Sequence, residues 1–457
     1  MDLKNLRITK PEDRAAVQYG RFIPLLLQLA LLLVVFKGFN LEGEAFFRLS
    51  TACFVGFAIH YLLPFRFKKQ GLIVLSILGG LYTLVHVDVR TPYFTELPTH
   101  LYIMATAVEL FAVPTIIVGS VVALAILFYF SLHLKAPFIV RLLPVVAIAC
   151  VLTYARQNNV GGLPNLFWSI VGSVFMFRLI LYAYDVRMSR QRESLTDYLC
   201  YMLLLPNFYF TLFPVVDYST FKRTWYARDI HVMAQEGIFW IVRGAVQLML
   251  YRLIYHRVVI GPYEVHDFWT MLQYIFPTYL LYLRVSGHFH IIVGMLKLFG
   301  YDLPETHRRY LLASSFTDFW RRINIYWKDF MIKCFFYPIH FRLRRKSETL
   351  ALIAGTISVF VATTVLHGYQ WFWLRGTFII TGPDVVFWTL LGVAVIINVL
   401  WETRSKAKAQ KEPQSKVVGM VIHALKVIAM YITMSILWSM WSTQELSDWF
   451  NTVMYWR

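Results

Sequence analysis

The stretch from Leu350 to Ile380 reads LALIAGTISVFVATTVLHGYQWFWLRGTFII, with seventeen residues ahead of His367 and thirteen behind it. About 20 predominantly apolar residues are enough to cross a bilayer as a helix, so this stretch predicts a transmembrane helix with an imidazole near its middle. Ionisable side chains are expensive in hydrocarbon and are typical of functional sites there. Because a histidine can also transfer protons near neutral pH, His367 is the first candidate for chemistry in the chain.

The composition of the 457-residue chain extends this interpretation to the whole protein. Hydrophobic residues make up 58% and charged residues 15%, and the mean hydropathy of +0.55 is far above that of a soluble domain. We therefore expect an all-α polytopic integral membrane protein. Apolar runs predict roughly eleven transmembrane helices, near residues 22–38, 46–64, 71–87, 101–132, 138–155, 164–184, 233–256, 267–284, 350–380, 384–402 and 417–440.

Two apolar segments contain prolines that interrupt a simple helix pattern. The segment 101–132 is either one long helix kinked at Pro114 or two shorter segments, and the sequence leaves both open. The segment 198–216 contains Pro206 and Pro214, which predicts a broken or re-entrant segment and not a continuous span.

The formal net charge of +18 raises the question of a nucleic-acid partner. The basic residues, however, punctuate hydrophobic segments and form no soluble basic domain, so we expect no nucleic-acid binding. They are typical of cytoplasmic loops under the positive-inside rule, which also places the basic N-terminus in the cytoplasm. Anionic lipids are the partners that this pattern predicts.

Residues 308–346 differ from the rest of the chain, because ten Lys or Arg side chains accompany only Asp318 and Asp329. At helical spacing, one broad face is apolar and holds Phe316, Phe319, Trp320, Ile323, Trp327, Phe330, Met331 and Cys334. Asn324 lies at the border of that face. This pattern predicts an interfacial or re-entrant amphipathic helix pair, hinged near Pro338. A basic helix lying against anionic lipid is the simpler alternative.

The stretch that begins at Tyr282 resembles the central signature of the membrane-bound O-acyltransferases. Bacterial members of that family show SGY-x-D, then a GF-x-LPENF-like segment, then FWRRWHISLS and a YIPL. The corresponding places hold, in order, Ser286-Gly287, Leu298 to Glu305, Phe319-Trp320-Arg321-Arg322 and Tyr337-Pro338. His367 matches the lone histidine that the family carries on a later apolar helix. The resemblance covers residues 282–370, the expected signature core of a single membrane-embedded acyltransferase domain over residues 1–457.

The chain departs from the bacterial pattern at several positions of this signature, among them Ile323, which replaces the tryptophan of FWRRW. Asn324 stands where many bacterial members have a histidine, and asparagine at this position is similar to the eukaryotic members. His288 and His290 replace the tyrosine and the aspartate of SGY-x-D. The resemblance to the family holds despite these departures, but the substrate of no particular subgroup can be assigned from it.

The resemblance implies that an acyl group passes from a thioester donor to a hydroxyl acceptor. Such a transfer needs a base, support for the developing oxyanion and exclusion of water. His367 is expected to be the general base, because a neutral imidazole is less costly in an apolar site than a carboxylate. Asn324 is expected to position a substrate or to support the oxyanion. The other candidates are the substrate- or tunnel-lining residues Trp320, Ser286, His290 and Trp371, and the donor-binding residues Arg321, Arg322 and Lys328.

The partners that the resemblance implies are an acyl carrier protein or acyl-CoA as donor and a hydroxyl-bearing acceptor. That acceptor would be a cell-surface polysaccharide, a cell-wall polymer or a secreted metabolite, with a partner protein outside the cytoplasm as a further expectation. The bacterial cytoplasmic (inner) membrane is the expected location. No cofactor is expected. His288 and His290 form an H-x-H pair, but carboxylates and cysteines are missing beside it, so no metal is expected either.

Two other classes of function remain open at the level of sequence. A transporter or flippase would use His367 and Asn324 to line a translocation path, but the chain shows no repeated helix groups of the kind that many transporters have. A catalytically inactive lipid- or sterol-sensing relative is the third hypothesis. Formation of an ester distinguishes the enzyme from both.

Overall fold

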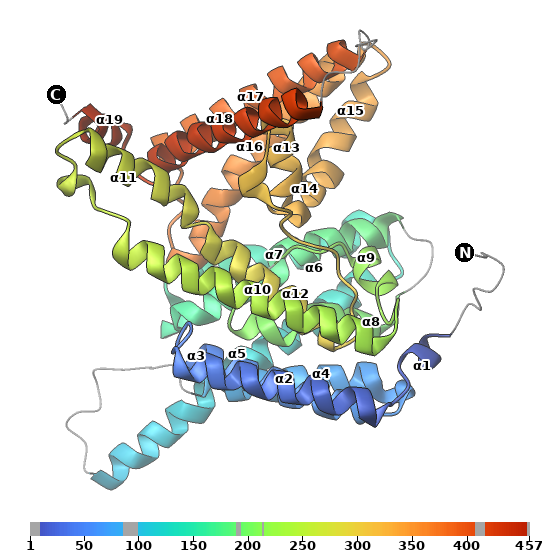
Figure 1. Cartoon of the computed structure of the whole chain (residues 1–457). Coiled ribbons are helices and arrows are strands. Elements are labelled where there is room, and N and C mark those ends of the chain that lie inside the picture. Colours follow the sequence, from blue (N-terminus) through green and yellow to red (C-terminus); the bar gives the residue numbers. More distant parts are fainter. Residues whose placement is uncertain (1–9, 86–98, 189–192, 213, 407–415, 455–457) are drawn as a thin grey trace. The chain divides into compact units, whose positions relative to one another are not determined.

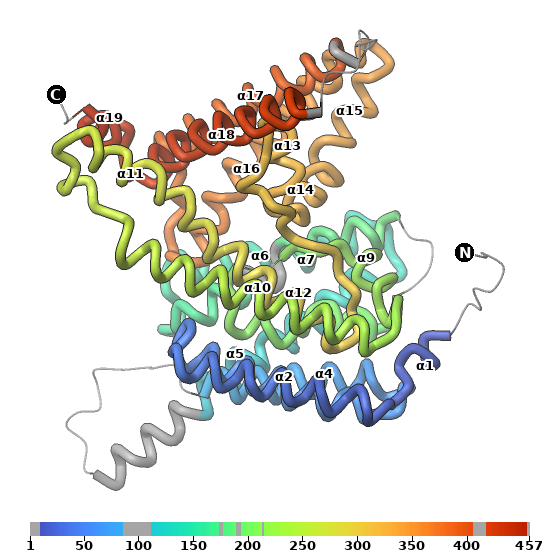
Figure 2. The backbone as a smooth tube through the Cα atoms, in the orientation of Figure 1, coloured from blue at the N-terminus to red at the C-terminus, as the bar shows by residue number. Residues whose placement is uncertain are grey.

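The computed structural model of the protein describes residues 10–85, 99–188, 193–212, 214–406 and 416–454 (Figure 1 and Figure 2). Within these residues the chain is helical, and its one β contact is an isolated antiparallel bridge between Trp225 and Tyr301. The predicted all-α architecture is therefore confirmed. The chain forms two compact units, of which the N-terminal unit comprises Met1–Ala245, Ile291–Pro304 and Trp373–Gly376 and the C-terminal unit comprises Val246–His290, Glu305–Phe372 and Thr377–Arg457.

The N-terminal unit contains several long apolar helices and some short ones. Its helices are α1 (Pro11–Arg14), α2 (Tyr19–Gly38), α3 (Glu44–Leu62), α4 (Lys68–Leu84), α5 (Thr99–Leu132), α6 (Phe138–Gln157), α7 (Asn165–Met188), α8 (Leu195–Met202), α9 (Tyr218–Arg223) and the first part of α10 (Ile230–Arg257). The last part of α12 (Leu283–Leu298) also belongs to this unit.

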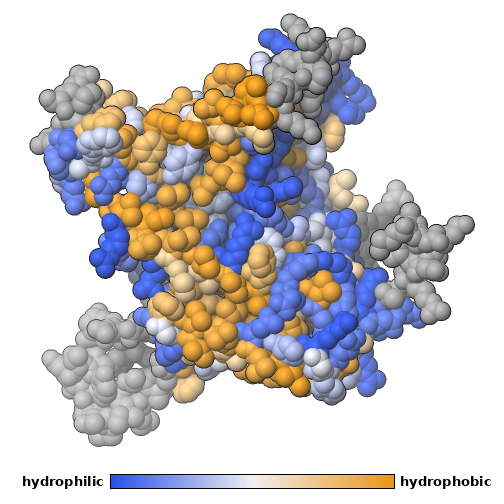
Figure 3. Space-filling model, in the orientation of Figure 1, coloured by the Kyte–Doolittle hydropathy of each residue, from blue (hydrophilic) through white to orange (hydrophobic). Residues whose placement is uncertain are grey.

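Ten helices among the described residues are long and apolar enough to cross a membrane. They correspond to ten of the eleven predicted spans, and the eleventh, predicted near 71–87, is helix α4, which has only 17 residues. The predicted end of that span, at residues 86 and 87, lies outside the described residues. Apolar side chains cover much of the surface (Figure 3), as on the exposed face of α2, where Leu27 and Leu31 point outward. This arrangement is typical of an integral membrane protein.

The two proline-containing segments behave differently. Residues 101–132 lie in the single helix α5, which contains Pro114, so the alternative of two shorter segments is excluded. The predicted break in 198–216 is confirmed, because α8 ends at Met202 and a 3-10 turn follows over Leu205–Phe208. The side chains of this turn are buried in protein. Irregular backbone at membrane depth is tolerated only in such surroundings.

At one end of the N-terminal unit, the end of α3 lies beside the start of α10. The hydroxyl of Tyr61 lies 2.8 Å from Nε2 of His231, and the backbone N–H of Gln18, just before α2, donates to the same hydroxyl at 2.7 Å. Arg14 donates to the carbonyl oxygens of Tyr226 and Ala227 beside them. We call this end, where α2, α4 and α10 begin, the basic end of the N-terminal unit.

Helices α10 and α12 cross closely at two glycines. A Cβ atom on Gly237 would lie 2.7 Å from the carbonyl oxygen of Gly294, and one on Gly294 would lie 2.5 Å from the carbonyl oxygen of Gly237. No side chain fits in this space. Small residues at such crossings let helix backbones approach closely within membranes.

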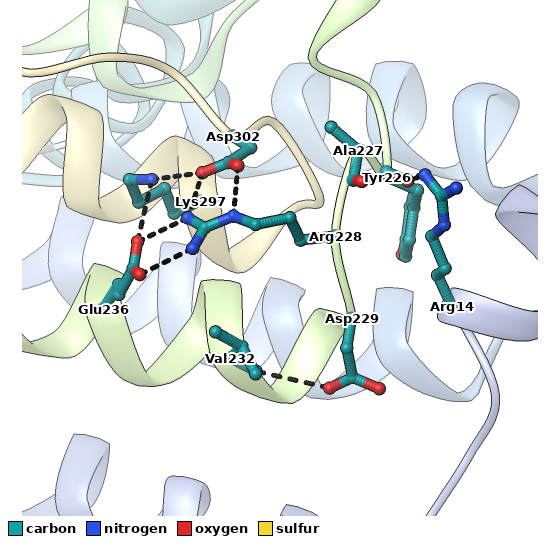
Figure 4. A network of polar contacts seen from close by, with 9 residues as sticks. All are labelled: Arg14, Tyr226, Ala227, Arg228, Asp229, Val232, Glu236, Lys297 and Asp302. Carbon is teal, nitrogen blue, oxygen red and sulfur yellow. Dashed lines mark hydrogen bonds and ion pairs between the residues drawn. The ribbon is translucent and has the colours of Figure 1, made fainter. Parts of the chain in front are cut away.

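A network of four charges lies at the basic end, next to this crossing (Figure 4). Arg228 donates to both carboxylate oxygens of Glu236, at 2.6 and 2.7 Å, and its Nε donates to Asp302 at 2.5 Å. The ammonium group of Lys297, a residue that is only 4% exposed, bonds to Asp302 and Glu236. Burial by itself would raise the pKa of Asp302, but the hydrogen bonds from Arg228 and Lys297 outweigh it and hold that pKa below 3.8.

The C-terminal unit holds the candidate site. Its helices are the last part of α10, α11 (Phe268–Leu280), the first part of α12, α13 (Phe316–Arg322), α14 (Ile325–Met331), a π-helical turn (Ile332–Phe336), α15 (Tyr337–Leu343), α16 (Glu348–Arg375), α17 (Gly382–Lys406), α18 (Lys416–Trp441) and α19 (Leu446–Met454). Helix α18 packs against α11 and α17, and α13 packs against α17 (Figure 1).

The predicted helix pair within 308–346 is present, but its hinge lies elsewhere than expected. Helix α13 ends at Arg322 and α14 begins at Ile325, so the break falls at Ile323 and Asn324. Beside Pro338 the backbone stays helical and only widens into the π-helical turn. Inside a helix a proline lacks the N–H donor and crowds the carbonyl of the preceding turn, and the wider π-helical turn directly before Pro338 accommodates it without a break.

Substitution of Gly294 by alanine should force α10 and α12 apart. Overpacking of this kind typically costs about 1–3 kcal/mol, so we expect a lower midpoint of thermal unfolding for the purified protein in detergent. Gly20→Ala is the matched control, because nothing lies within 4 Å of the added Cβ there. Equal midpoints for the two variants would show that the crossing is not tightly packed.

Asp302→Asn should leave Lys297 with one carboxylate partner fewer in a buried position. Removing one member of a buried pair costs about 3–5 kcal/mol, whereas Glu44→Gln at the exposed Lys37–Glu44 pair should change stability by less than about 1 kcal/mol. Because the folded pKa of Asp302 is lowered, its contribution to stability is present above about pH 4 and is lost as the pH falls through the folded value. Unfolding midpoints measured from pH 7 to pH 3 should therefore converge between the wild type and Asp302→Asn.

Candidate functional site

His367 lies in α16, and its ring is oriented by the helix backbone. Nδ1 is 2.8 Å from the carbonyl oxygen of Thr363, one turn earlier. A carbonyl oxygen can only accept, so Nδ1 carries the proton and Nε2 keeps its lone pair. Among the described residues the imidazole has no other hydrogen-bond partner. A neutral histidine with an unused Nε2 lone pair is the form that a general base requires.

Three tryptophan rings from three helices surround the imidazole. The ring centroid of His367 lies 4.8 Å from that of Trp388 on α17, 5.7 Å from that of Trp327 on α14 and 6.1 Å from that of Trp441 on α18. The large apolar surfaces of these rings cover part of the imidazole, and His367 is half-buried.

Asn324 is the residue at the break between α13 and α14. Its φ of 37° is in the left-handed region, which asparagine tolerates better than most residues, and its side-chain oxygen accepts a hydrogen bond from the backbone N–H of Trp327 at 3.3 Å. Asn324 therefore caps α14. The oxygen makes the cap, and the amide nitrogen keeps its two donors, because no bond to it is formed within the described part of the chain.

Trp327 connects the two predicted catalytic residues. Its backbone N–H binds the side chain of Asn324, and its indole ring contacts the imidazole of His367 edge to face. The sequence separation of 43 residues gave no reason to expect this proximity. Asn324 and His367 therefore belong to one neighbourhood within the C-terminal unit.

The predicted lining residues Trp320 and Trp371 lie on or against α16. The ring of Trp320 is 4.8 Å from that of Phe360, which precedes His367 by two helical turns. Trp371 follows His367 by one turn on the same helix. Both tryptophans are half-buried. Their positions fit a lining role along the helix that carries His367.

The predicted donor-binding residues already have acidic partners. Arg322 donates to Asp318 at 2.7 Å, and Lys328 lies 2.9 Å from Asp329. The side chain of Arg321 is 63% exposed and meets Glu402 at 3.7 Å. Arg321 is thus the member of this group that an anionic ligand could most readily reach.

Ser286 and His290 lie in a second, fully buried polar cluster of the C-terminal unit. Nδ1 of His290 is 2.6 Å from Oε1 of Gln247, and the hydroxyl of Ser286 is 3.3 Å from that of Tyr310. The ring of His290 also lies 5.8 Å from that of His307. These two predicted lining residues therefore do not contact His367.

An aromatic series joins this polar cluster to the His367 neighbourhood. Tyr282 binds Nε2 of His307 through its hydroxyl at 3.0 Å, and its ring lies 5.2 Å from that of Trp438. Trp438 in turn lies 5.0 Å from Trp441, one of the three tryptophans beside the imidazole. The two sites are neighbours separated by tryptophan rings.

Among the described residues, no group of three or more His, Cys, Asp or Glu side chains is arranged to hold a metal ion. No protein-family model matches the chain, and no curated protein matches it either. Function is therefore inferred from the chain's own residues and from its resemblance to the O-acyltransferase signature.

Sequence reasoning missed the residues that surround His367 from other helices. Trp388 and Trp441 lie in apolar runs, where a tryptophan is ordinarily a packing residue, and nothing in their spacing relates them to position 367. Thr363 could have been found, because a carbonyl four residues before a helical histidine is within reach of its ring. Nothing in the sequence around His307 indicated that it would lie beside His290.

Asn324→Ala should lose both the cap of α14 and the tolerance of asparagine for a left-handed backbone. We expect a loss of about 1–2 kcal/mol, measured by thermal or chemical unfolding of the purified protein. Asn324→Gly, which adopts this backbone freely and caps nearly as well, should lose less. An alanine variant as stable as the glycine variant would contradict the assigned backbone conformation.

Proposed function

We propose that the protein is a membrane-embedded O-acyltransferase that moves an acyl group from a thioester to a hydroxyl. The observation that carries this proposal is the connection of Asn324 to His367 through Trp327. It unites an amide donor and a neutral imidazole, from the two motifs that resemble the family signature, beside apolar rings. Acyl transfer needs a general base, a hydrogen-bond donor to the oxyanion and a surface that keeps water away.

In the proposed reaction, Nε2 of His367 takes the proton of the acceptor hydroxyl as its oxygen attacks the thioester carbonyl carbon. A C–O bond forms, and the carbonyl oxygen becomes an oxyanion, to which the amide N–H of Asn324 donates. Collapse of this tetrahedral intermediate breaks the C–S bond. The departing thiolate takes the proton from the imidazolium, which leaves an ester, a free thiol and the neutral histidine.

The hydrogen bond from Nδ1 to Thr363 keeps the ring from turning during this cycle. It also stabilises the imidazolium, because a backbone carbonyl accepts more strongly from a charged donor. Asn324 cannot titrate and is therefore unsuited to move the proton itself. The two residues accordingly have separate roles, His367 as base and Asn324 as oxyanion donor or positioning residue.

The proposed donor is an acyl-CoA or an acyl carrier protein, both of which carry phosphate. Arg321 is the exposed guanidinium of the FWRR motif and the proposed contact for that phosphate. The basic end of the N-terminal unit, with Arg14 and Lys68, is proposed to face the cytoplasm under the positive-inside rule. A bacterial inner membrane, an acceptor such as a cell-surface polysaccharide and an extracytoplasmic partner complete the proposal.

His367→Ala should lower acyl transfer by about 10²-fold or more, the scale of a lost general base. The measurement uses purified protein in lipid nanodiscs, radiolabelled acyl-CoA or acyl carrier protein, and a membrane extract that supplies the acceptor. Ester product is scored as label released by alkaline hydroxylamine. Near-normal turnover of the variant would overturn the assignment of the base. Movement of an unmodified solute without ester formation would favour a transporter.

Asn324→Asp distinguishes a catalytic asparagine from a structural cap. Aspartate keeps the oxygen that caps α14 and tolerates the same backbone, but it lacks the N–H donor and brings a negative charge toward the oxyanion. We expect a loss of about 10²-fold in kcat, the scale of removing an oxyanion donor, with the unfolding midpoint close to that of the wild type. Full activity in Asn324→Asp would show that Asn324 only caps α14 and takes no part in catalysis.

A further inference from the structure

Asp384 has two separate tasks at the start of α17. One carboxylate oxygen accepts from the backbone N–H of Thr381 at 2.9 Å and from its hydroxyl at 2.8 Å, while the backbone N–H of Asp384 donates back to that hydroxyl at 3.2 Å. This reciprocal arrangement is a capping box, which explains a Thr-x-x-Asp sequence at a helix start. It uses only one of the two oxygens.

The second oxygen of Asp384 accepts the indole N–H of Trp441 at 2.6 Å. A hydrogen bond to an ionised carboxylate is stronger and more directional than one to a neutral acceptor. Trp441 is also stacked on Phe387 at 4.6 Å with an interplanar angle of 11°. Its ring is therefore fixed at one edge by a charge and across one face by another ring.

Trp441 in this fixed position is one wall of the His367 neighbourhood. Its ring meets the imidazole at an angle of 74°, and it also contacts Trp388 at 5.5 Å. Trp388 follows Asp384 by one turn of α17, so the carboxylate and the second tryptophan lie on the same helix face.

We propose that Asp384 is a positioning residue, which holds Trp441 against His367 and so fixes the direction of the Nε2 lone pair. The proposal rests on the proposed function, since that direction matters only if His367 takes a proton from a substrate. The hydrogen bond to Thr363 fixes one edge of the imidazole, and the tryptophan rings fix its plane. Removing the carboxylate frees the indole of Trp441 to rotate and opens that wall of the site.

A purely structural role for Asp384 makes a different prediction. If the carboxylate served only to start α17, loss of the capping box from either side would have the same effect. Thr381→Ala breaks the capping box but leaves the bond between Asp384 and Trp441. Trp441→Phe removes that bond but leaves the capping box. Comparison of these two variants therefore separates the capping role of Asp384 from its bond to Trp441.

The experiment measures how fast diethyl pyrocarbonate modifies His367 in the full-length protein in detergent micelles. The modified peptide is quantified by mass spectrometry, and His266, whose side chain is 66% exposed, serves as the internal standard. We expect Asp384→Ala and Trp441→Phe to raise the rate at His367 severalfold while His266 is unchanged. Thr381→Ala should resemble the wild type, and Asp384→Asn, whose amide oxygen can still accept from the indole, should lie between Asp384→Ala and the wild type.

Two results would overturn the proposal. One is a wild-type rate at His367 in both Asp384→Ala and Trp441→Phe, and the other is an equal change in Thr381→Ala and Asp384→Ala. If Asp384→Ala does not fold, the comparison of Asp384→Asn and Trp441→Phe with Thr381→Ala decides in the same way. The readout needs no substrate, so a failed acyl-transfer assay would count against the proposed function alone. In a working assay, Asp384→Ala should lower kcat by about tenfold or more and leave KM nearly unchanged, because misplaced catalytic groups lose rate and not binding.

Discussion

Polar groups inside hydrocarbon have no water to bond with, and this constraint accounts for most of the structure. Backbone groups are satisfied within helices, and the break at Leu205–Phe208 in the N-terminal unit is enclosed by protein. Charges obey the same rule, since the buried Lys297 is held by two carboxylates. His367 also obeys it, because its Nδ1 is bonded to the carbonyl oxygen of Thr363 on its own helix.

The positions of the long helices could be predicted from the sequence, because apolar length is itself the physical requirement for crossing a membrane. The helix around His367 was predicted on that ground, and the break after α8 was predicted from Pro206 and Pro214. The hinge in 308–346 was assigned wrongly to Pro338. The helix passes Pro338 by widening into the π-helical turn Ile332–Phe336, whereas the left-handed conformation of Asn324 separates α13 from α14 without any proline.

Only some residues of the candidate site could be predicted from the sequence. Its two polar members were found through their resemblance to a known signature, and the grouping of Asn324 with His367 stands on contacts that no spacing reveals. Trp388 and Trp441 belong to helices later in the chain, and only the packing of those helices places them beside His367. Ser286 and His290 share the signature with Asn324 but lie in a different buried cluster, and their lining role stays a prediction.

We propose that Asn324, Trp327 and His367 form one acyl-transfer site. An electron cryo-microscopy structure of the protein with an acyl-phosphopantetheine analogue, in which a thioether replaces the reactive thioester, would test this proposal. We expect the analogue beside the indole of Trp327, with its sulfur end between the amide of Asn324 and Nε2 of His367. Density for the analogue at another place, or an imidazole turned toward lipid, would contradict it.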